Sequence, residues 1–174
     1  DSITLIASVR AGNVIGGGDW SAYRLIPDCV KAINQQEVIE IRAPHSIRPW
    51  QHVLDPLHGY LLIGDKLLKR QKELVGAWNF APNSESMVKV ETVVSKLIHE
   101  WGAGQYKVVN SEQFHETERL ILNADKAYHL LKWQPKFSFD VSIKKTVDWY
   151  KSFYENKNMN DVSLNQINGF ENLK

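Results

Sequence analysis

The sequence predicts an α/β fold with a parallel sheet, and its first eighteen residues carry the main observations. The run Ile3–Ser8 is apolar and rich in β-forming residues, as in a strand buried on both faces of a parallel sheet. The chain then enters a loop that contains Gly16, Gly17 and Gly18. A buried strand that opens into a glycine-rich loop is a common place for ligand binding in α/β sheets.

The next segments alternate between helix and strand patterns. Apolar residues at helical spacing predict a helix over Leu25–Asn34. Val38–Ile41 is predicted to be a short strand and Ile47–Leu54 an extended segment. We expect Asp55 to cap a second helix with proline at its first position. The apolar stripe expected to face inward on that helix is Leu57, Tyr60, Leu61, Gly64, Leu67 and Leu68.

The second half repeats this alternation and ends in a polar region. A strand is predicted over Ala77–Phe80 and a helix from a Ser86 cap to Trp101. A strand over Tyr106–Val109, a short helix over Ala124–Leu131 and a final helix capped by Asp140 follow. We expect one domain over residues 1–157, and a polar, partly disordered tail over residues 158–174.

Composition excludes several classes of function. The chain has 174 residues, 43% hydrophobic and 24% charged, which suits a single globular domain. A net charge of +1 gives no electrostatic signature for nucleic acid or an anionic membrane. Cys29 is the single cysteine, which excludes an internal disulfide and a cysteine-rich zinc site. We find neither a signal peptide nor a membrane-spanning run, and expect a cytoplasmic protein.

Three motifs resemble a known superfamily. Arg10–Gly16, Arg24–Pro27 and Arg48–Val53 together resemble the C-terminal half of the extended short-chain dehydrogenase/reductases, which handle nucleotide sugars. The spelling Gly16–Trp20 with Arg48–Val53 is most similar to the CDP-glucose 4,6-dehydratases. The resemblance implies the last parallel strands of a Rossmann sheet followed by a mixed α/β sugar-nucleotide-binding domain.

The resemblance also implies an activity for the complete enzyme. Tightly held NAD would take and return a hydride while water is eliminated, so that CDP-glucose becomes CDP-4-keto-6-deoxyglucose, a precursor of cell-surface deoxysugars such as those of O-antigen. The family's dinucleotide loop and its catalytic Tyr-x-x-x-Lys pair lie upstream of the matching segment. We therefore expect a fragment that is inactive alone. Its partner would be the N-terminal half, which holds most of the NAD, or another copy in a homo-oligomer.

Two alternatives remain at this point. The chain could come from a related epimerase, or from a dehydratase that acts on a dTDP- or GDP-sugar. It could also be a non-catalytic module that binds nucleotide sugars or serves as an interaction surface.

Asn13 and Arg48 are the principal candidates for substrate binding. An asparagine can both donate and accept hydrogen bonds, although a loop asparagine often only caps its own backbone. The planar guanidinium of Arg48 matches two phosphate oxygens at once, and the alternative is a surface ion pair. The resemblance implies that both residues contact the diphosphate of the sugar nucleotide.

The resemblance implies further ligand contacts. Arg24 and Leu25 would lie near the ligand loop, and Arg42 would lie beside the base and ribose, although a solvated arginine and an ordinary turn are the alternatives for Arg24 and Arg42. Of the two asparagines near Pro82, one would face the substrate, and we assign this role to Asn83. The remaining contacts would be His115 to the substrate and Val14 to the NAD cofactor.

Two patterns imitate catalytic motifs. Tyr128 and Lys132 spell Tyr-x-x-x-Lys, but they lie in the segment that is structural in the resembling family, so we predict no catalytic role for them. We expect the hydroxyl of Tyr128 to lie away from any cleft formed by Asn13, Arg48 and Asn83. The run Gly16–Gly18 lacks the spacing of a dinucleotide fingerprint, and the histidines lack metal-ligand spacing.

Overall fold

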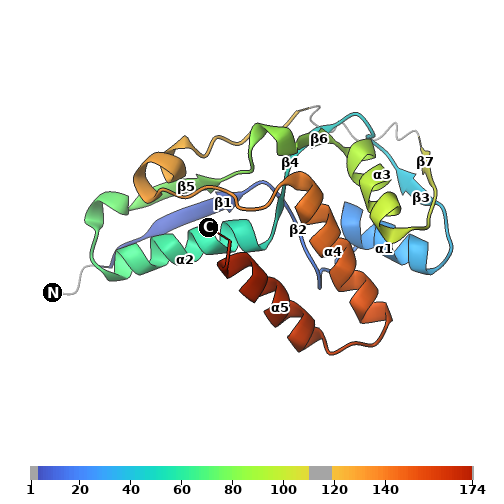
Figure 1. The fold of residues 1–174 in the computed structure, drawn as a ribbon. Coiled ribbons are helices and arrows are strands. Elements are labelled where there is room, and N and C mark those ends of the chain that lie inside the picture. Colours follow the sequence, from blue (N-terminus) through green and yellow to red (C-terminus); the bar gives the residue numbers. More distant parts are fainter. Residues whose placement is uncertain (1–3, 110–118, 174) are drawn as a thin grey trace.

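Three small sheets organise the chain in its computed structural model, which describes residues 4–109 and 119–173 (Figure 1). Parallel pairing joins β1 to β5, β2 to β4 and β3 to β7, and β4 also pairs antiparallel with β6. The strands are β1 (Ala7–Ala11), β2 (Asn13–Ile15), β3 (Ile39–Ile41), β4 (Ile47–His52), β5 (Gly76–Phe80), β6 (Met87–Lys89) and β7 (Tyr106–Val108). The predicted α/β class with parallel strands is confirmed.

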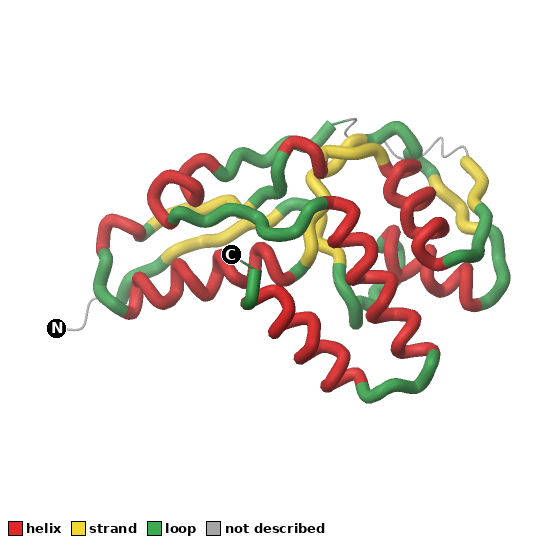
Figure 2. The backbone as a smooth tube through the Cα atoms, in the orientation of Figure 1, coloured by secondary structure: helices red, strands yellow, loops and turns green. Residues whose placement is uncertain are grey.

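Helices lie along these sheets (Figure 2). The helical elements are α1 (Leu25–Asn34), α2 (Leu54–Leu68), η1 (Lys72–Leu74), η2 (Ser84–Ser86), α3 (Val90–Trp101), η3 (Ala127–Leu131), α4 (Phe139–Tyr154) and α5 (Met159–Glu171). Helix α2 packs along β1 and β5, whereas α1 packs against β3 at the other end of the molecule. None of the helices in the described ranges is long and apolar enough to cross a membrane.

The hydrophobic interior is divided into two clusters. Around β5, Trp78 and Phe80 are buried together with Ile63 of α2, and the Trp133 ring meets the edge of Phe80 with centroids 4.9 Å apart. The larger cluster joins α1, α3 and α4, where Cys29 is fully buried. Its raised pKa of about 12, caused by burial, keeps this thiol protonated and inert. Cys29 is therefore a packing residue.

The first strand begins later than predicted and is not buried on both faces. Strand β1 begins at Ala7, and the residues along it alternate between half-buried and exposed. Ile6, which we expected inside a buried strand, is 69% exposed. The reason is that α2 covers one face of the β1–β5 pair, and the described residues place no layer of comparable size on the other face.

Helix α2 also presents a different face from the predicted one. Its buried residues are Asp55, Pro56, Gly59 and Ile63, whereas three leucines of the expected stripe are exposed. Those three are Leu57, Leu61 and Leu68. The helix carries apolar residues around most of its circumference, so spacing alone could not decide which side meets the β5 core.

Three helix starts differ by a few residues from the predictions. Asp55 lies inside α2 and does not cap it. Ser86 ends a short 3₁₀ turn, and α3 begins only at Val90 because the three residues before it pair with β4. Helix α4 is capped by Ser138, one residue before its start, and Asp140 lies in its first turn.

The expected disordered tail is wrong. Residues 159–171 form α5, and the side chain of Asn158 caps it by accepting a hydrogen bond from the N–H of Asn160. Phe170 is buried, with its ring edge-on to Phe137 at 5.2 Å, and Lys136 Nζ donates to the carbonyl of Leu173 at 2.6 Å. Hydrogen bonds between α5 and α4, from Trp149 to Ser163 and from Gln166 to the carbonyl of Lys145, add to these contacts and hold a helix whose polar composition suggested disorder.

Candidate functional site

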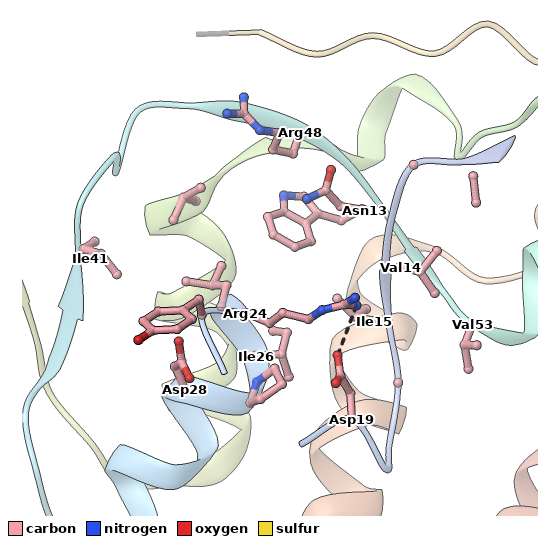
Figure 3. Close-up of a pocket in the computed structure, with 18 of the residues that line it drawn as sticks. Asn13, Val14, Ile15, Asp19, Arg24, Ile26, Asp28, Ile41, Arg48 and Val53 are labelled. Carbon is pink, nitrogen blue, oxygen red and sulfur yellow. Dashed lines mark hydrogen bonds and ion pairs between the residues drawn. The ribbon is translucent and has the colours of Figure 1, made fainter. Parts of the chain in front are cut away.

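A cavity of about 930 Å³ opens where β2, the start of α1, the end of β3 and β4 come together (Figure 3). We call it the Arg48 cavity. The predicted residues that line it are Asn13, Val14, Arg24, Leu25, Arg42 and Arg48. They come from four segments that are well separated in sequence. A cavity of this size is typical of small-molecule sites.

Asn13 and Arg48 are positioned by neighbouring parallel strands. Asn13 opens β2 opposite Trp50 of β4. Arg48 lies two residues before Trp50, and its Nη1 donates to the carbonyl of Ile47 at 3.0 Å. A Cβ on Gly12 would lie 2.5 Å from the carbonyl oxygen of Pro49, so glycine is what allows these strands to approach. The pairing brings the two side chains to one wall of the cavity.

Arg24 and Asp19, which follow the glycine-rich loop, form an ion pair at the edge of the Arg48 cavity. Their Nη1 and Oδ2 atoms are 3.4 Å apart, and the arginine side chain is 65% exposed. Burial alone would raise the pKa of Asp19, but the hydrogen bonds from Ser21 and the charge of Arg24 hold it below its usual value. Asp19 therefore stays ionised and orients Arg24 at the cavity edge. An exposed pair of this kind contributes little to stability.

The glycine-rich loop has a packing role that the sequence did not reveal. A Cβ on Gly17 would come within 2.0 Å of the Trp149 indole, so this glycine is required by the approach of α4. Gly18 adopts a positive φ of 81°, which closes the turn before Asp19. The loop borders the cavity, but Gly17 lies against protein.

Asp28 is a cavity residue that our sequence analysis missed. It lies in the first turn of α1 and lines the Arg48 cavity. Desolvation raises its pKa above the usual value, although the charges of Lys31 and Arg42 oppose this shift. Its position in the sequence could have indicated this role, because Asp28 directly follows the motif Arg24–Pro27. The cavity also contains Glu40, whose carboxylate meets Lys107 Nζ at 2.8 Å.

Asn83 does not lie with the other predicted residues. It lines a second cavity of about 410 Å³, together with Tyr128 and Arg119, which we call the Asn83 cavity. The expectation that Asn13, Arg48 and Asn83 form one cleft is therefore wrong, because Asn83 lines a different cavity from the other two. His115 lies outside the described residues.

The imitation motif at Tyr128 has an unusual local structure. Tyr128 belongs to the π-helical turn η3, and Lys132 follows in a left-handed conformation with φ of 56°. The Tyr128 side chain is 54% exposed and its ring lies edge-on to His129. Tyr128 is not among the residues that line the Arg48 cavity, but it shares a cavity with Asn83, one of the three residues from which we expected it to lie away.

Val14, the predicted cofactor contact, lies at the wall of the Arg48 cavity. In residues 4–109 and 119–173, no cluster of three histidine, cysteine or acidic side chains could hold a metal ion. Val14 is 38% exposed at the cavity wall, where a cofactor could touch it. Of the neighbouring glycine-rich loop, Gly17 lies against the Trp149 indole, although the loop also borders the cavity.

Comparisons with known proteins place these features in context. The chain is 38% identical over 166 residues to CDP-glucose 4,6-dehydratase of Salmonella typhimurium, a match that covers 95% of the chain. It spans 46% of that relative, so about half of the relative's length, and the match is consistent with a C-terminal half. No protein-family model matches the sequence.

Solved structures share the fold. The dTDP-glucose 4,6-dehydratase of Bacillus anthracis, in complex with NAD, matches 87% of the chain and 46% of its own length with a TM-score of 0.68 and 21% identity. The UDP-glucuronic acid 4-epimerase of Bacillus cereus, bound to a fluorinated UDP-sugar and NAD, matches 85% of the chain and 46% of its own length. Its TM-score is 0.71 at 16% identity. The fold is thus that of the C-terminal part of sugar-nucleotide dehydratases and epimerases.

Proposed function

Since this chain resembles CDP-glucose 4,6-dehydratase along nearly its whole length, we propose that it is the sugar-nucleotide-binding portion of such an enzyme. The complete enzyme would convert CDP-glucose to CDP-4-keto-6-deoxyglucose in the cytoplasm. The substrate would lie in the Arg48 cavity. Hydride transfer and proton transfer would be carried out by groups outside this chain.

The observation that carries the proposal is the convergence of basic and amide side chains on one cavity. Arg48, Arg42 and Arg24 border it together with Asn13. Guanidinium groups pair with phosphate oxygens through two parallel hydrogen bonds, and an amide adds a further donor. A diphosphate therefore suits this group of arginine and asparagine side chains better than an uncharged sugar would.

Binding and orientation are the tasks that these residues would perform. Arg48 and Asn13, which come from paired strands, would fix the diphosphate, and Leu25 would pack against the nucleoside. Binding energy from the nucleotide would then place the sugar for chemistry performed elsewhere. NAD supplies the hydride chemistry when it is bound, and we expect it to be held mostly by the N-terminal half of the enzyme or by an assembled partner. The chain alone should therefore bind substrate without converting it.

Other sugar nucleotides are the nearest alternative ligands, because structures with this fold belong to dTDP- and UDP-sugar enzymes. Isothermal titration calorimetry with the 174-residue chain tests the proposal. We expect saturable binding of CDP-glucose and much weaker binding of glucose 1-phosphate, which lacks the nucleoside and one phosphate. Absence of CDP-glucose binding would contradict the proposal. Conversion of CDP-glucose by the chain with added NAD would contradict its assignment as a binding portion only.

A further inference from the structure

We propose that the carboxylate of Asp28 selects cytosine over uracil in the Arg48 cavity by accepting a hydrogen bond from the exocyclic amino group of the base. This inference rests on the proposed function, because it assigns the base-reading residue of the same site. It adds a specificity determinant from a position that our sequence analysis did not single out.

The first step is the place of Asp28 in the cavity. Figure 3 shows Arg48 and Asn13 toward one end of the cavity and Asp28 with Ile41 toward another. Asp28 is fixed by the first turn of α1, where its backbone N–H donates to the carbonyl of Arg24 at 3.0 Å. Ile41 ends β3 and is 2% exposed, so this end of the cavity has a rigid apolar wall.

The second step is the direction in which a nucleotide would lie. A diphosphate carries negative charge and is repelled by the carboxylate of Asp28, but it is attracted to the guanidinium of Arg48. The phosphates therefore take the Arg48 end, and the nucleoside extends toward Asp28 and Ile41. An apolar wall beside a carboxylate suits the flat face and the polar edge of a base.

The third step compares Asp28 with the other acidic residues of the cavity. Asp19 already accepts hydrogen bonds from Arg24 and from the N–H of Ser21, at 3.4 and 3.0 Å. Glu40 is paired with Lys107 at 2.8 Å. The carboxylate of Asp28 feels the charges of Lys31 and Arg42 and accepts from the backbone N–H of Tyr23, and its exposed side chain has further lone pairs to offer. The raised pKa of Asp28 reflects partial desolvation, which a ligand donor would offset.

The fourth step is the chemistry of the bases. Cytosine presents an amino group at its fourth position, which donates to a carboxylate. Uracil presents a carbonyl oxygen at that position, which a carboxylate repels. The mismatch with uracil leaves this polar contact unmade, which disfavours the wrong ligand, although less than at a fully buried site because Asp28 is exposed. We therefore expect CDP to bind about tenfold more tightly than UDP.

Calorimetric titration of the chain with CDP and with UDP tests the inference. In Asp28→Asn the new amide can donate to the uracil carbonyl, so the CDP-to-UDP affinity ratio should fall to about one or invert. Asp28→Leu should also lose the preference, since it offers no acceptor. Asp65→Asn, a matched change at a carboxylate that is paired with Lys69 outside the cavity, should keep the ratio. Circular dichroism spectra verify that each variant is folded.

The outcomes separate the inference from the function beneath it. A wild-type preference for CDP that disappears in both Asp28 variants and persists in Asp65→Asn supports the assignment. Equal binding of CDP and UDP by the wild type, or a preference that survives in an Asp28 variant, overturns the role of Asp28 and leaves nucleotide binding intact. Failure of the wild type to bind either nucleotide overturns both proposals.

Discussion

The buried carboxylate of Asp55 accepts a hydrogen bond from the backbone N–H of Lys136 at 2.6 Å, across 81 positions of sequence. The Trp133 indole adds a bond from its Nε1 to the carbonyl of Asp55 at 3.2 Å, and the Phe137 ring lies edge-on to His52. The start of α2 thus anchors the segment that leads into α4. Burial raises the pKa of Asp55 to about 6 and lowers that of His52 to about 4.

We predict that these two groups give opposite pH dependences of stability. The folded protein favours protonated Asp55, so this carboxyl loses its stabilising contribution as the pH rises from the unfolded pKa of 3.8 through about 6. The folded protein favours neutral His52, so this imidazole loses its contribution as the pH falls from 6.5 through about 4. Each effect amounts to about 3 kcal/mol at most, and the two largely cancel between pH 4 and 6.

Urea unfolding at pH 4, 5, 6 and 7 measures this balance with single variants. Relative to wild type, Asp55→Asn should lose stability as the pH falls from 6.5, because only the His52 effect remains. His52→Gln should instead gain relative stability as the pH falls from 6. Profiles parallel to wild type in both variants would show that neither pKa is shifted in this way.

For Arg48, we predict that Arg48→Ala weakens CDP-glucose binding by about 2–3 kcal/mol, the usual loss for a charged hydrogen-bond partner. Arg48→Lys should recover only part of this affinity, because lysine lacks the planar pair of donors. The matched control is Arg10→Ala, since Arg10 is exposed on β1 and is not a lining residue of the cavity. Calorimetry in which Arg48→Ala and wild type bind equally would contradict a phosphate-binding role.

Local pattern predicted some elements accurately. The bounds of α1 were confirmed, and β5 begins only one residue before the predicted strand, because the amphipathic spacing and β-forming residues of each agree with their tertiary surroundings. The buried side of α2 was not predictable, since leucines occupy both its exposed and its inner face. Helix α5 was missed because Phe170 and two backbone acceptors for Lys136 hold it, contacts that involve residues some 34 positions apart.

The candidate site likewise contains residues that could be placed from the sequence and residues that could not. Asn13 and Arg48 could be grouped because the motifs that contain them resemble those of one family, and the structure places both at the starts of the paired strands β2 and β4. Asn83 could not be placed, since a 3₁₀ turn and an antiparallel strand redirect the chain after β5. Nothing in the local sequence around Gly17 indicates that its neighbour is Trp149, which lies 132 positions further on.

We predict that Gly17→Ala destabilises the fold by about 1–3 kcal/mol, because the new methyl group would overlap the Trp149 indole. Gly64→Ala is the matched control: the space around Gly64 is open, and alanine is favoured in a helix by about 1 kcal/mol. The cost of Gly17→Ala should shrink on a Trp149→Ala background. Denaturant unfolding of the three single variants and of the Gly17→Ala/Trp149→Ala double variant measures these free energies. If Gly17→Ala lowers the free energy of unfolding by the same amount with and without Trp149, the proposed overlap is contradicted.

Tyr128→Phe should leave CDP-glucose affinity within about twofold of wild type, since Tyr128 is outside the lining of the Arg48 cavity. The change removes one hydroxyl and keeps the ring that lies against His129. The same calorimetric titration used for Arg48→Ala provides the comparison. A tenfold loss of affinity in Tyr128→Phe would assign the substrate to the Asn83 cavity, which Tyr128 does line.

The contact between Gly17 and Trp149 constrains how this protein can diverge. Any side chain at position 17 would occupy the volume that the indole fills, so a substitution there is tolerated only after the aromatic residue at position 149 has become smaller. The two positions should accordingly change together or not at all among homologous sequences. The glycine-rich loop that borders the Arg48 cavity is therefore constrained by helix α4, whose Trp149 is not among the residues that line that cavity.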